Sequence, residues 1–396
     1  MPDSWIESLD KQFNQENSRK ILSKENYNFI IKSEFRKGKM DTCAFYGPDF
    51  SYKFNGKQEY KFIKTPPKEL ELVNIDCKID SLENIIEIVK DNPYQSNKKY
   101  NIPLKKLHDI CPHLEKLNNM VGINKLKTQL LEQIIYFIQD LHINSANESE
   151  YLHTILAGPP GTGKTAIAEI IGTIYAHLGI LKKKTFKKVT RSDLIGGYLG
   201  QTAIKTKDAI KSSLGGVLFI DEAYALGNSE KRDSFSKECI DTLCESLSHY
   251  KDQLMVIIAG YEEELQNCFF AYNQGLASRF IWKFKIEKYT AEELSGIFAK
   301  KIKDAEWSLE CSEIGNKKWF EKNILWFPCF GRDIENLITK IKICHSKRIF
   351  GVNTCKVKHI SALDLEKGFA IYKENDNLKK NLEKDEMSKS LCSIYV

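Results

Sequence analysis

The feature that most constrains the fold of this chain is a glycine-rich segment, residues 158–165, which reads GPPGTGKT. It matches the template G-x-x-x-x-G-K-[ST] without a mismatch. An apolar run at residues 153–157 precedes it, and an apolar helical pattern starts at Lys164. Glycines in such a loop let backbone N–H groups turn toward phosphate oxygens, and the following helix places its positive end there. Strand, loop and helix in this order predict a site for a nucleoside triphosphate.

Individual residues of the loop have distinct predicted roles. We expect Lys164 to reach the β- and γ-phosphates and to act in catalysis, and the Thr165 hydroxyl to be a ligand of Mg²⁺. The other loop residues are expected to bind the nucleotide: Gly158, Pro159, Pro160, Gly161, Thr162 and Gly163.

A second apolar run, residues 216–220, is followed directly by the carboxylates Asp221 and Glu222. A continuous β-branched and aromatic run is typical of a parallel strand covered on both faces, and functional residues gather at the carboxyl ends of such strands. We expect Asp221 to bind the nucleotide's Mg²⁺ directly or through water, and Glu222 to polarise the attacking water. Glycine loop and paired carboxylates together predict hydrolysis.

Composition limits the class of protein. A length of 396 residues predicts two or three domains, and 42% hydrophobic residues suffice for sizeable cores. The net charge of +6 is spread along the chain and indicates nucleic acid only weakly. Eleven cysteines occur without a C-x-x-C pair, and no apolar run approaches membrane-spanning length. We expect a soluble protein of the cytoplasm or another reducing intracellular compartment, without a membrane partner.

The N-terminal part, residues 1–116, carries no catalytic pattern. Alternating aromatics on both sides of Asn55-Gly56 predict a β-hairpin, residues 70–79 predict a further strand, and Asp80 with Glu83 is expected to cap a helix. We interpret this part as an α+β substrate or adaptor region.

A loop at residues 191–202 places Tyr198 and Leu199 between glycines. A buried loop would leave backbone polar groups without partners, so this apolar tip is expected to face a partner or a channel. From residue 289 the pattern becomes helical, and residues 374–396 are charged and predict a flexible tail.

With these motifs in hand, residues 117–373 resemble the AAA+ ATPases, and among them the branch of red-type rubisco activase (CbbX/CfxQ) and the SpoVK-like proteins. The resemblance rests on the order and spacing of MVGI, GPPGTGKT, VTRSDLIGGYLGQT, GGVLFIDEAYAL, VIIAGY and SRF. It implies an α/β P-loop fold: a parallel five-stranded sheet sandwiched by helices (117–288) and a helical lid (289–373). ATP and Mg²⁺ are the implied cofactors.

The same resemblance implies further roles. Val121 and Gly122 would contact adenine, Arg279 would be an arginine finger that reaches the neighbouring subunit's γ-phosphate, and Arg332 would be the sensor 2 residue of the lid. Many members end the third strand in Asn or Thr as sensor 1, whereas this chain has Tyr261 after Ala-Gly, so that role stays open.

The resemblance also implies a homo-oligomer, a hexameric ring, in which Tyr198 and Leu199 grip a polypeptide in the central pore. The first functional hypothesis is therefore ATP-driven remodelling or threading of a protein substrate. The alternative is a nucleic-acid motor or a clamp-loader-like switch, which would need basic pore loops to neutralise phosphates. The loop GGYLGQ favours polypeptide. An ATP-binding scaffold without turnover is disfavoured because Lys164, Asp221, Glu222 and Arg279 are all present.

Overall fold

The computed structural model describes residues 71–142, 150–198, 200–227, 233–351 and 357–374, together with the backbone of five strands within residues 19–63. The chain divides into two compact units. One contains residues 1–73 and 96–99, and the other contains residues 74–95 and 100–396. Residues 375–396 of the predicted tail lie outside the described residues.

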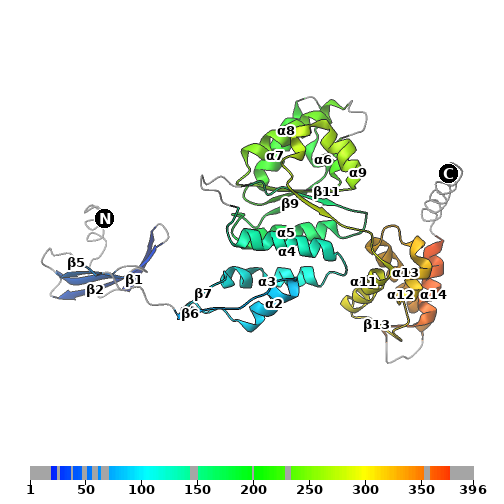
Figure 1. Cartoon of the computed structure of the whole chain (residues 1–396), viewed down its shortest axis with the longest axis horizontal. Helices are drawn as coiled ribbons and strands as arrows, with labels where there is room; N and C mark the ends of the chain where they lie inside the picture. Colours follow the sequence, from blue (N-terminus) through cyan, green and yellow to red (C-terminus); the bar gives the residue numbers. More distant parts are fainter. Residues whose placement is uncertain are drawn as a thin grey trace. The chain divides into compact units, whose positions relative to one another are not determined.

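The first unit contains an antiparallel five-stranded meander in which the strands pair in chain order (Figure 1). Its strands are β1 (Arg19–Lys24), β2 (Tyr27–Arg36), β3 (Lys39–Tyr46), β4 (Ser51–Asn55) and β5 (Lys61–Ile63). The predicted hairpin is confirmed, because β4 pairs antiparallel with β5, with Tyr52 opposite Phe62. A short two-stranded sheet follows, formed by β6 (Glu71–Val73) and β7 (Lys98–Tyr100). The strand expected over residues 70–79 is therefore only three residues long.

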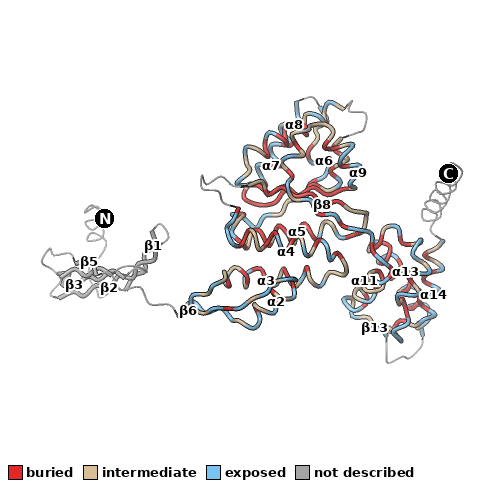
Figure 2. Tube along the Cα trace, in the orientation of Figure 1, coloured by how far each residue is buried: buried red, intermediate tan, exposed pale blue. Residues whose placement is uncertain are grey.

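The second unit is built on a five-stranded sheet whose neighbouring strands are all parallel, as predicted. In spatial order the strands are β12 (Trp282–Lys285), β8 (Thr154–Ala157), β11 (Met255–Gly260), β10 (Val217–Ile220) and β9 (Phe186–Val189). Strands β8, β10 and β11 are buried along their whole length (Figure 2), which explains their continuous apolar sequences.

Helices cover both faces of this sheet (Figure 1). On one side lie α4 (Asn124–Ile138) and α5 (Lys164–His177), and on the other lie α6 (Arg191–Leu194), α7 (Gln201–Ser213) and α8 (Ser234–His249). Alternate side chains of β10 pack on opposite faces of the sheet. Phe219 belongs to the hydrophobic cluster of α4 and α5, and Leu218 and Ile220 belong to that of α7 and α8.

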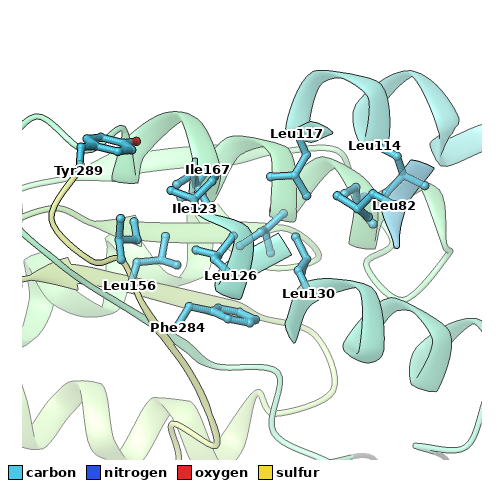
Figure 3. Packing of buried hydrophobic residues seen from close by; sticks show 14 of the residues in the cluster. Leu82, Leu114, Leu117, Ile123, Leu126, Leu130, Leu156, Ile167, Phe284 and Tyr289 are labelled. Carbon is cyan, nitrogen blue, oxygen red and sulfur yellow. The ribbon is translucent and has the colours of Figure 1, made fainter. Parts of the chain in front are cut away.

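Two helices that precede α4 in the chain also pack on the α4 and α5 side. They are α2 (Leu82–Asp91) and α3 (Leu104–Asn118), and their buried residues share one cluster with α4, α5 and the sheet (Figure 3). We therefore propose that the sheet-containing unit begins near residue 74 rather than at residue 117. The N-cap of α2 is also one residue later than expected: Ser81 forms the capping box with Asn84, in place of Asp80 with Glu83.

A small helical subdomain follows β12. Its helices are α11 (Ala291–Asp304), α12 (Lys317–Asn323), α13 (Gly331–Ile349) and α14 (Ala362–Lys373), with a short parallel pair of strands, β13 (Ser308–Leu309) and β14 (His359–Ile360). A capping box of Thr290 with Glu293, whose Thr-x-x-Glu pattern is readable in the sequence, is present at the start of α11. Two short α-helices, α9 (Glu262–Glu264) and α10 (Gln274–Ala277), lie between β11 and β12. Within the described residues no helix is both long and apolar enough to cross a membrane.

Candidate nucleotide-binding site

A cavity of about 690 Å³ lies where the glycine loop, the ends of β10 and β11, and the helical subdomain meet. It collects most of the residues that the sequence indicated. Those that line it are Val121, Pro160, Gly161, Thr162, Gly163, Lys164, Thr165, Asp221, Glu222 and Arg332. Gly122, Gly158 and Pro159 are not among its lining residues but belong to the segments that form its walls. Two predicted residues, Arg279 and Tyr198, lie elsewhere.

The glycine loop needs its glycines. Gly161 and Gly163 have φ values of 70° and 83°, a left-handed conformation that glycine adopts without strain. A Cβ on Gly161 would overlap the carbonyl oxygen of Cys329, and a Cβ on Gly158 would come within 2.9 Å of Ile286. The loop is thus fixed both by backbone conformation and by the close approach of later segments.

Lys164, the first residue of α5, is held by the loop itself. Its Nζ donates to the carbonyl oxygens of Gly158 at 2.9 Å and Pro159 at 2.7 Å, and it lies over the ring of Tyr261, 5.6 Å from the centroid. Burial lowers the pKa of this lysine, because the charged form loses its hydration. Phosphate oxygens would offer the ammonium stronger, charged acceptors than these carbonyls.

The two carboxylates follow β10 on the same side of the cavity. Asp221 accepts a hydrogen bond from the backbone N–H of Glu222 at 3.2 Å through Oδ1, and its Oδ2 pairs with Lys188 Nζ at 2.7 Å. Glu222 itself has φ 50° and ψ 46°, a left-handed conformation unusual for a non-glycine residue. Such backbone outliers are common at functional sites, and here the sharp turn follows directly on the strand.

The residues present fit a magnesium ion. The Thr165 hydroxyl and the Asp221 carboxylate line the same cavity and are hard oxygen donors, which Mg²⁺ prefers. A site with one or two protein oxygens is typical for Mg²⁺ because the ion keeps several waters and takes its other ligands from nucleotide phosphates. No additional cluster of metal-ligating side chains occurs in the part of the chain that the structure describes.

Two helices contact the Val121-Gly122 segment, α11 through Glu293 and α4 through Lys127. Gly122 has φ 70°, and a Cβ there would overlap the side chain of Glu293 at the start of α11. On the other side Lys127 Nζ of α4 donates to the Met120 carbonyl at 2.7 Å. The segment therefore lies beside the cavity in a fixed conformation, with Val121 lining it.

The helical subdomain contacts the glycine loop directly. The backbone N–H of Gly331, the first residue of α13, donates to the Gly161 carbonyl at 3.1 Å, and Arg332 follows it in the cavity wall. The Tyr289 hydroxyl donates to the Thr162 carbonyl at 3.2 Å. This subdomain thus forms one wall of the cavity.

Arg279 lies outside the cavity, after α10. Its Nε donates to Ser248 Oγ at 2.7 Å, and its Nη1 donates to the Gly275 carbonyl. From this position its guanidinium does not reach a nucleotide in the cavity of its own chain. Tyr198 is 75% exposed, and Leu199 lies outside the described residues.

Several further residues line the cavity, and among them only Tyr261, whose sensor 1 role stayed open, was considered from the sequence. Tyr261 and Tyr224 stack with ring centroids 5.4 Å apart, and both line the cavity. Burial raises the pKa of Tyr224 to about 12. The helical subdomain adds charged residues of α11 and α13: Lys300, Lys301, Asp304 and Glu335. In sequence a charged stripe of this kind is indistinguishable from a solvated helix face.

The fold and this cavity define a P-loop protein with a nucleoside-triphosphate site. Residues 154–274 match the family described as ATPase family associated with various cellular activities (AAA). The chain is 43% identical over 299 residues to a putative cfxQ-like protein of Acanthamoeba polyphaga mimivirus. The match covers 75% of this chain and 73% of that protein. It is 33% identical to the chloroplastic ribulose bisphosphate carboxylase/oxygenase activase of Cyanidioschyzon merolae, over 60% of this chain and 79% of that one.

A third relative is stage V sporulation protein K of Bacillus subtilis, 36% identical over 51% of this chain and 63% of its own length. The chain belongs to the AAA+ ATPases, in the branch of the CbbX/CfxQ and SpoVK proteins. It is an enzyme that binds and hydrolyses ATP.

Proposed function

We propose that this chain uses ATP hydrolysis to remodel or thread a protein substrate, with ATP and Mg²⁺ in the cavity described above. Lys164 and Arg332 would bind the phosphates, and Thr165 and Asp221 would hold Mg²⁺, which supplies charge neutralisation to the transferred phosphoryl group. Their positions around one cavity support these roles.

Glu222 would polarise the attacking water. It follows Asp221 directly, both residues line the same cavity, and the backbone of Glu222 is left-handed just after β10 ends. A carboxylate is a sufficient base here because the main demands of phosphoryl transfer are positioning and charge stabilisation.

The position of Arg279 supports a ring. An arginine that lies outside the cavity of its own chain can contribute to hydrolysis only from a second copy, and a closed ring gives every copy such a neighbour. We propose a homo-oligomer, hexameric as in the resembling family, in which Arg279 reaches the neighbour's γ-phosphate. An arginine finger of this kind contributes about 10³- to 10⁵-fold in rate.

The observation that carries the proposed substrate class is the exposure of Tyr198. This side chain is 75% exposed in the connection between α6 and α7, where Gly197 precedes it and Gly200 follows Leu199. No lysine or arginine occurs from residue 192 to residue 204. An exposed aromatic tip without cations suits contact with a polypeptide, whereas phosphates would need neutralising charges. The relative named as an activase of ribulose bisphosphate carboxylase/oxygenase also supports a protein substrate.

We propose a corresponding division of the chain. The meander of the N-terminal unit would be the substrate or adaptor region, residues up to 288 would form the large ATPase subdomain, and residues 289–373 would form the lid. Residues 374–396 stay a predicted tail.

Two variants of the full chain test the proposal. Glu222→Gln should bind ATP and assemble but lose hydrolysis by at least about a hundredfold, as expected when a general base is removed. Tyr198→Ala should keep basal hydrolysis and lose its stimulation by a protein substrate, which a pull-down with the Glu222→Gln variant would identify. Unimpaired turnover in Glu222→Gln would contradict the assigned role of Glu222.

Stimulation of wild-type hydrolysis by single- or double-stranded DNA, and by no captured protein, would favour the nucleic-acid alternative.

A further inference from the structure

The ion pair between Lys188 and Asp221 joins two neighbouring strands beside the glycine loop. In the parallel pair of β9 and β10, Lys188 lies opposite Phe219, and Asp221 is two residues further on the same face. Lys188 Nζ lies 2.7 Å from Asp221 Oδ2 and 5.9 Å from the centre of the Phe219 ring. The register of the sheet therefore places a cation on the carboxylate that would hold the metal.

Both oxygens of Asp221 are engaged in this arrangement. Oδ2 takes the Lys188 ammonium, and Oδ1 accepts the N–H of Glu222. The carboxylate of Asp221 is 22% exposed, and the Lys188 side chain is 46% exposed. Because the lysine is half in water, its ammonium can leave the carboxylate without becoming a buried, unpaired charge.

Mg²⁺ and the ammonium would compete for one carboxylate. This argument rests on the proposed role of Asp221 as a metal ligand. A divalent cation bound to Asp221, directly or through water, would lie within a few ångströms of the Lys188 charge, where like charges repel. Asp221 therefore binds each of the two cations more weakly when the other is present.

We propose that Lys188 is a positioning residue: it holds Asp221 in place in the nucleotide-free site and is displaced when Mg²⁺ arrives with the nucleotide. Without metal it neutralises one of two adjacent carboxylates, Asp221 and Glu222. It also weakens the binding of Mg²⁺, which favours entry of the metal together with phosphates. A second cavity of about 550 Å³, lined by Lys188, Thr190, Ser192 and Glu222 among others, gives the displaced side chain room.

Four variants of the full chain test this inference. Lys188→Met and Lys188→Gln remove the charge, and Lys188→Arg retains it. Lys187→Met is the matched control, because Lys187 is on the same strand but directs its Nζ to Ser212 Oγ, 2.7 Å away, on α7. The measurement is the affinity for ADP, by calorimetry, at increasing Mg²⁺ concentration. A cooperative thermal transition checks that each variant is folded.

The charge-removing variants should reach half-saturation at about two- to fivefold lower Mg²⁺ than wild type, the range that a half-exposed ion pair gives. Lys188→Arg and Lys187→Met should behave as wild type. An unchanged or higher half-saturating Mg²⁺ concentration in both Lys188→Met and Lys188→Gln would overturn the inference and leave the nucleotide site intact. If ADP binding by wild type does not depend on Mg²⁺, both the metal role of Asp221 and the inference fall.

Discussion

The backbone N–H of Gly331 donates to the carbonyl oxygen of Gly161 at 3.1 Å, so a main-chain hydrogen bond joins the proposed lid to the glycine loop. Neither position has room for a side chain. A Cβ on Gly331 would come within 2.7 Å of the Gly161 oxygen, and one on Gly161 would overlap the Cys329 carbonyl. Since the contact joins the phosphate loop to the N-terminus of α13, any change in the loop is transmitted to the lid.

Replacing Gly161 with Ala tests this contact, and Gly179→Ala is the matched control. Both glycines have a left-handed backbone, with φ 70° and 81°, but a Cβ on Gly179 would meet nothing within 4 Å. Both variants should lose about 1–2 kcal/mol for the left-handed backbone. Only Gly161→Ala should also bind ADP at least about tenfold more weakly, because its Cβ displaces the lid. Thermal unfolding and calorimetry measure the two effects, and equal ADP affinities in the two variants would contradict the prediction.

Arg279→Ala tests catalysis between subunits. Because Arg279 contacts Ser248 and not its own cavity, the variant should bind ATP like wild type and hydrolyse it about 10³-fold or more slowly. Mixing Arg279→Ala with Glu222→Gln should restore part of the hydrolysis, since some interfaces then combine an intact cavity with an intact arginine. A mixture as inactive as its two components would argue against an arginine that acts on the neighbouring subunit.

Lys127→Met should weaken nucleotide binding with little change in kcat. Lys127 Nζ donates to the carbonyls of Asn118 and Met120, at 2.9 and 2.7 Å, and thereby fixes the segment that contains Val121. Hydrogen bonds from a charged donor contribute about 1.5–3 kcal/mol, so KM for ATP should rise about tenfold or more. Lys125→Met, which removes an exposed pair with Glu287, is the control. A fall in kcat at unchanged KM would show that the lysine acts on chemistry instead.

The lid contains a pH-dependent element at Asp364. Burial acts to raise the pKa of this carboxyl group, but hydrogen bonds from Arg348, the Ser361 backbone and His345 outweigh it and hold the pKa well below its usual range. Because the folded-state pKa lies below the unfolded one, the stabilisation is present above about pH 4 and is lost as the pH falls further.

Asp364→Asn should therefore lower the free energy of unfolding by about 2–4 kcal/mol at pH 7, because it leaves the partners of a buried carboxylate without their charge. The difference from wild type should shrink at pH 3. Chemical denaturation of the full chain at both pH values measures it, and an equal difference at the two values would rule out the ionised carboxylate as the cause.

Local sequence patterns predicted the parts of the fold that local interactions determine. The strand before the glycine loop ends at Ala157 and the helix begins at Lys164, because hydrophobic periodicity and glycine content change there within a few residues. The capping box of Thr290 with Glu293 needs only residues three apart and is present. Continuous apolar runs correctly indicated strands buried on both faces.

Contacts between distant segments could not be predicted in this way. Lys188 looks like an ordinary lysine at a strand edge until the register of β9 against β10 places it on Asp221. The contact of Gly331 with Gly161 depends on how the lid packs, which no local pattern encodes. The placement of α3 with the sheet-containing unit likewise follows from tertiary packing of an amphipathic helix, whose apolar face gives no information about its partner.

The division of the hydrophobic residues by the sheet gives the enzyme two mechanically different halves. One cluster runs from α2 and α3 through α4 and α5 into the lid, and the cluster beneath α7 and α8 contains no residue of the lid. Opening of the lid therefore strains the first half directly. The Tyr198 loop belongs to the second half, so a nucleotide signal reaches it through the carboxyl ends of β9 and β10, where Lys188 pairs with Asp221.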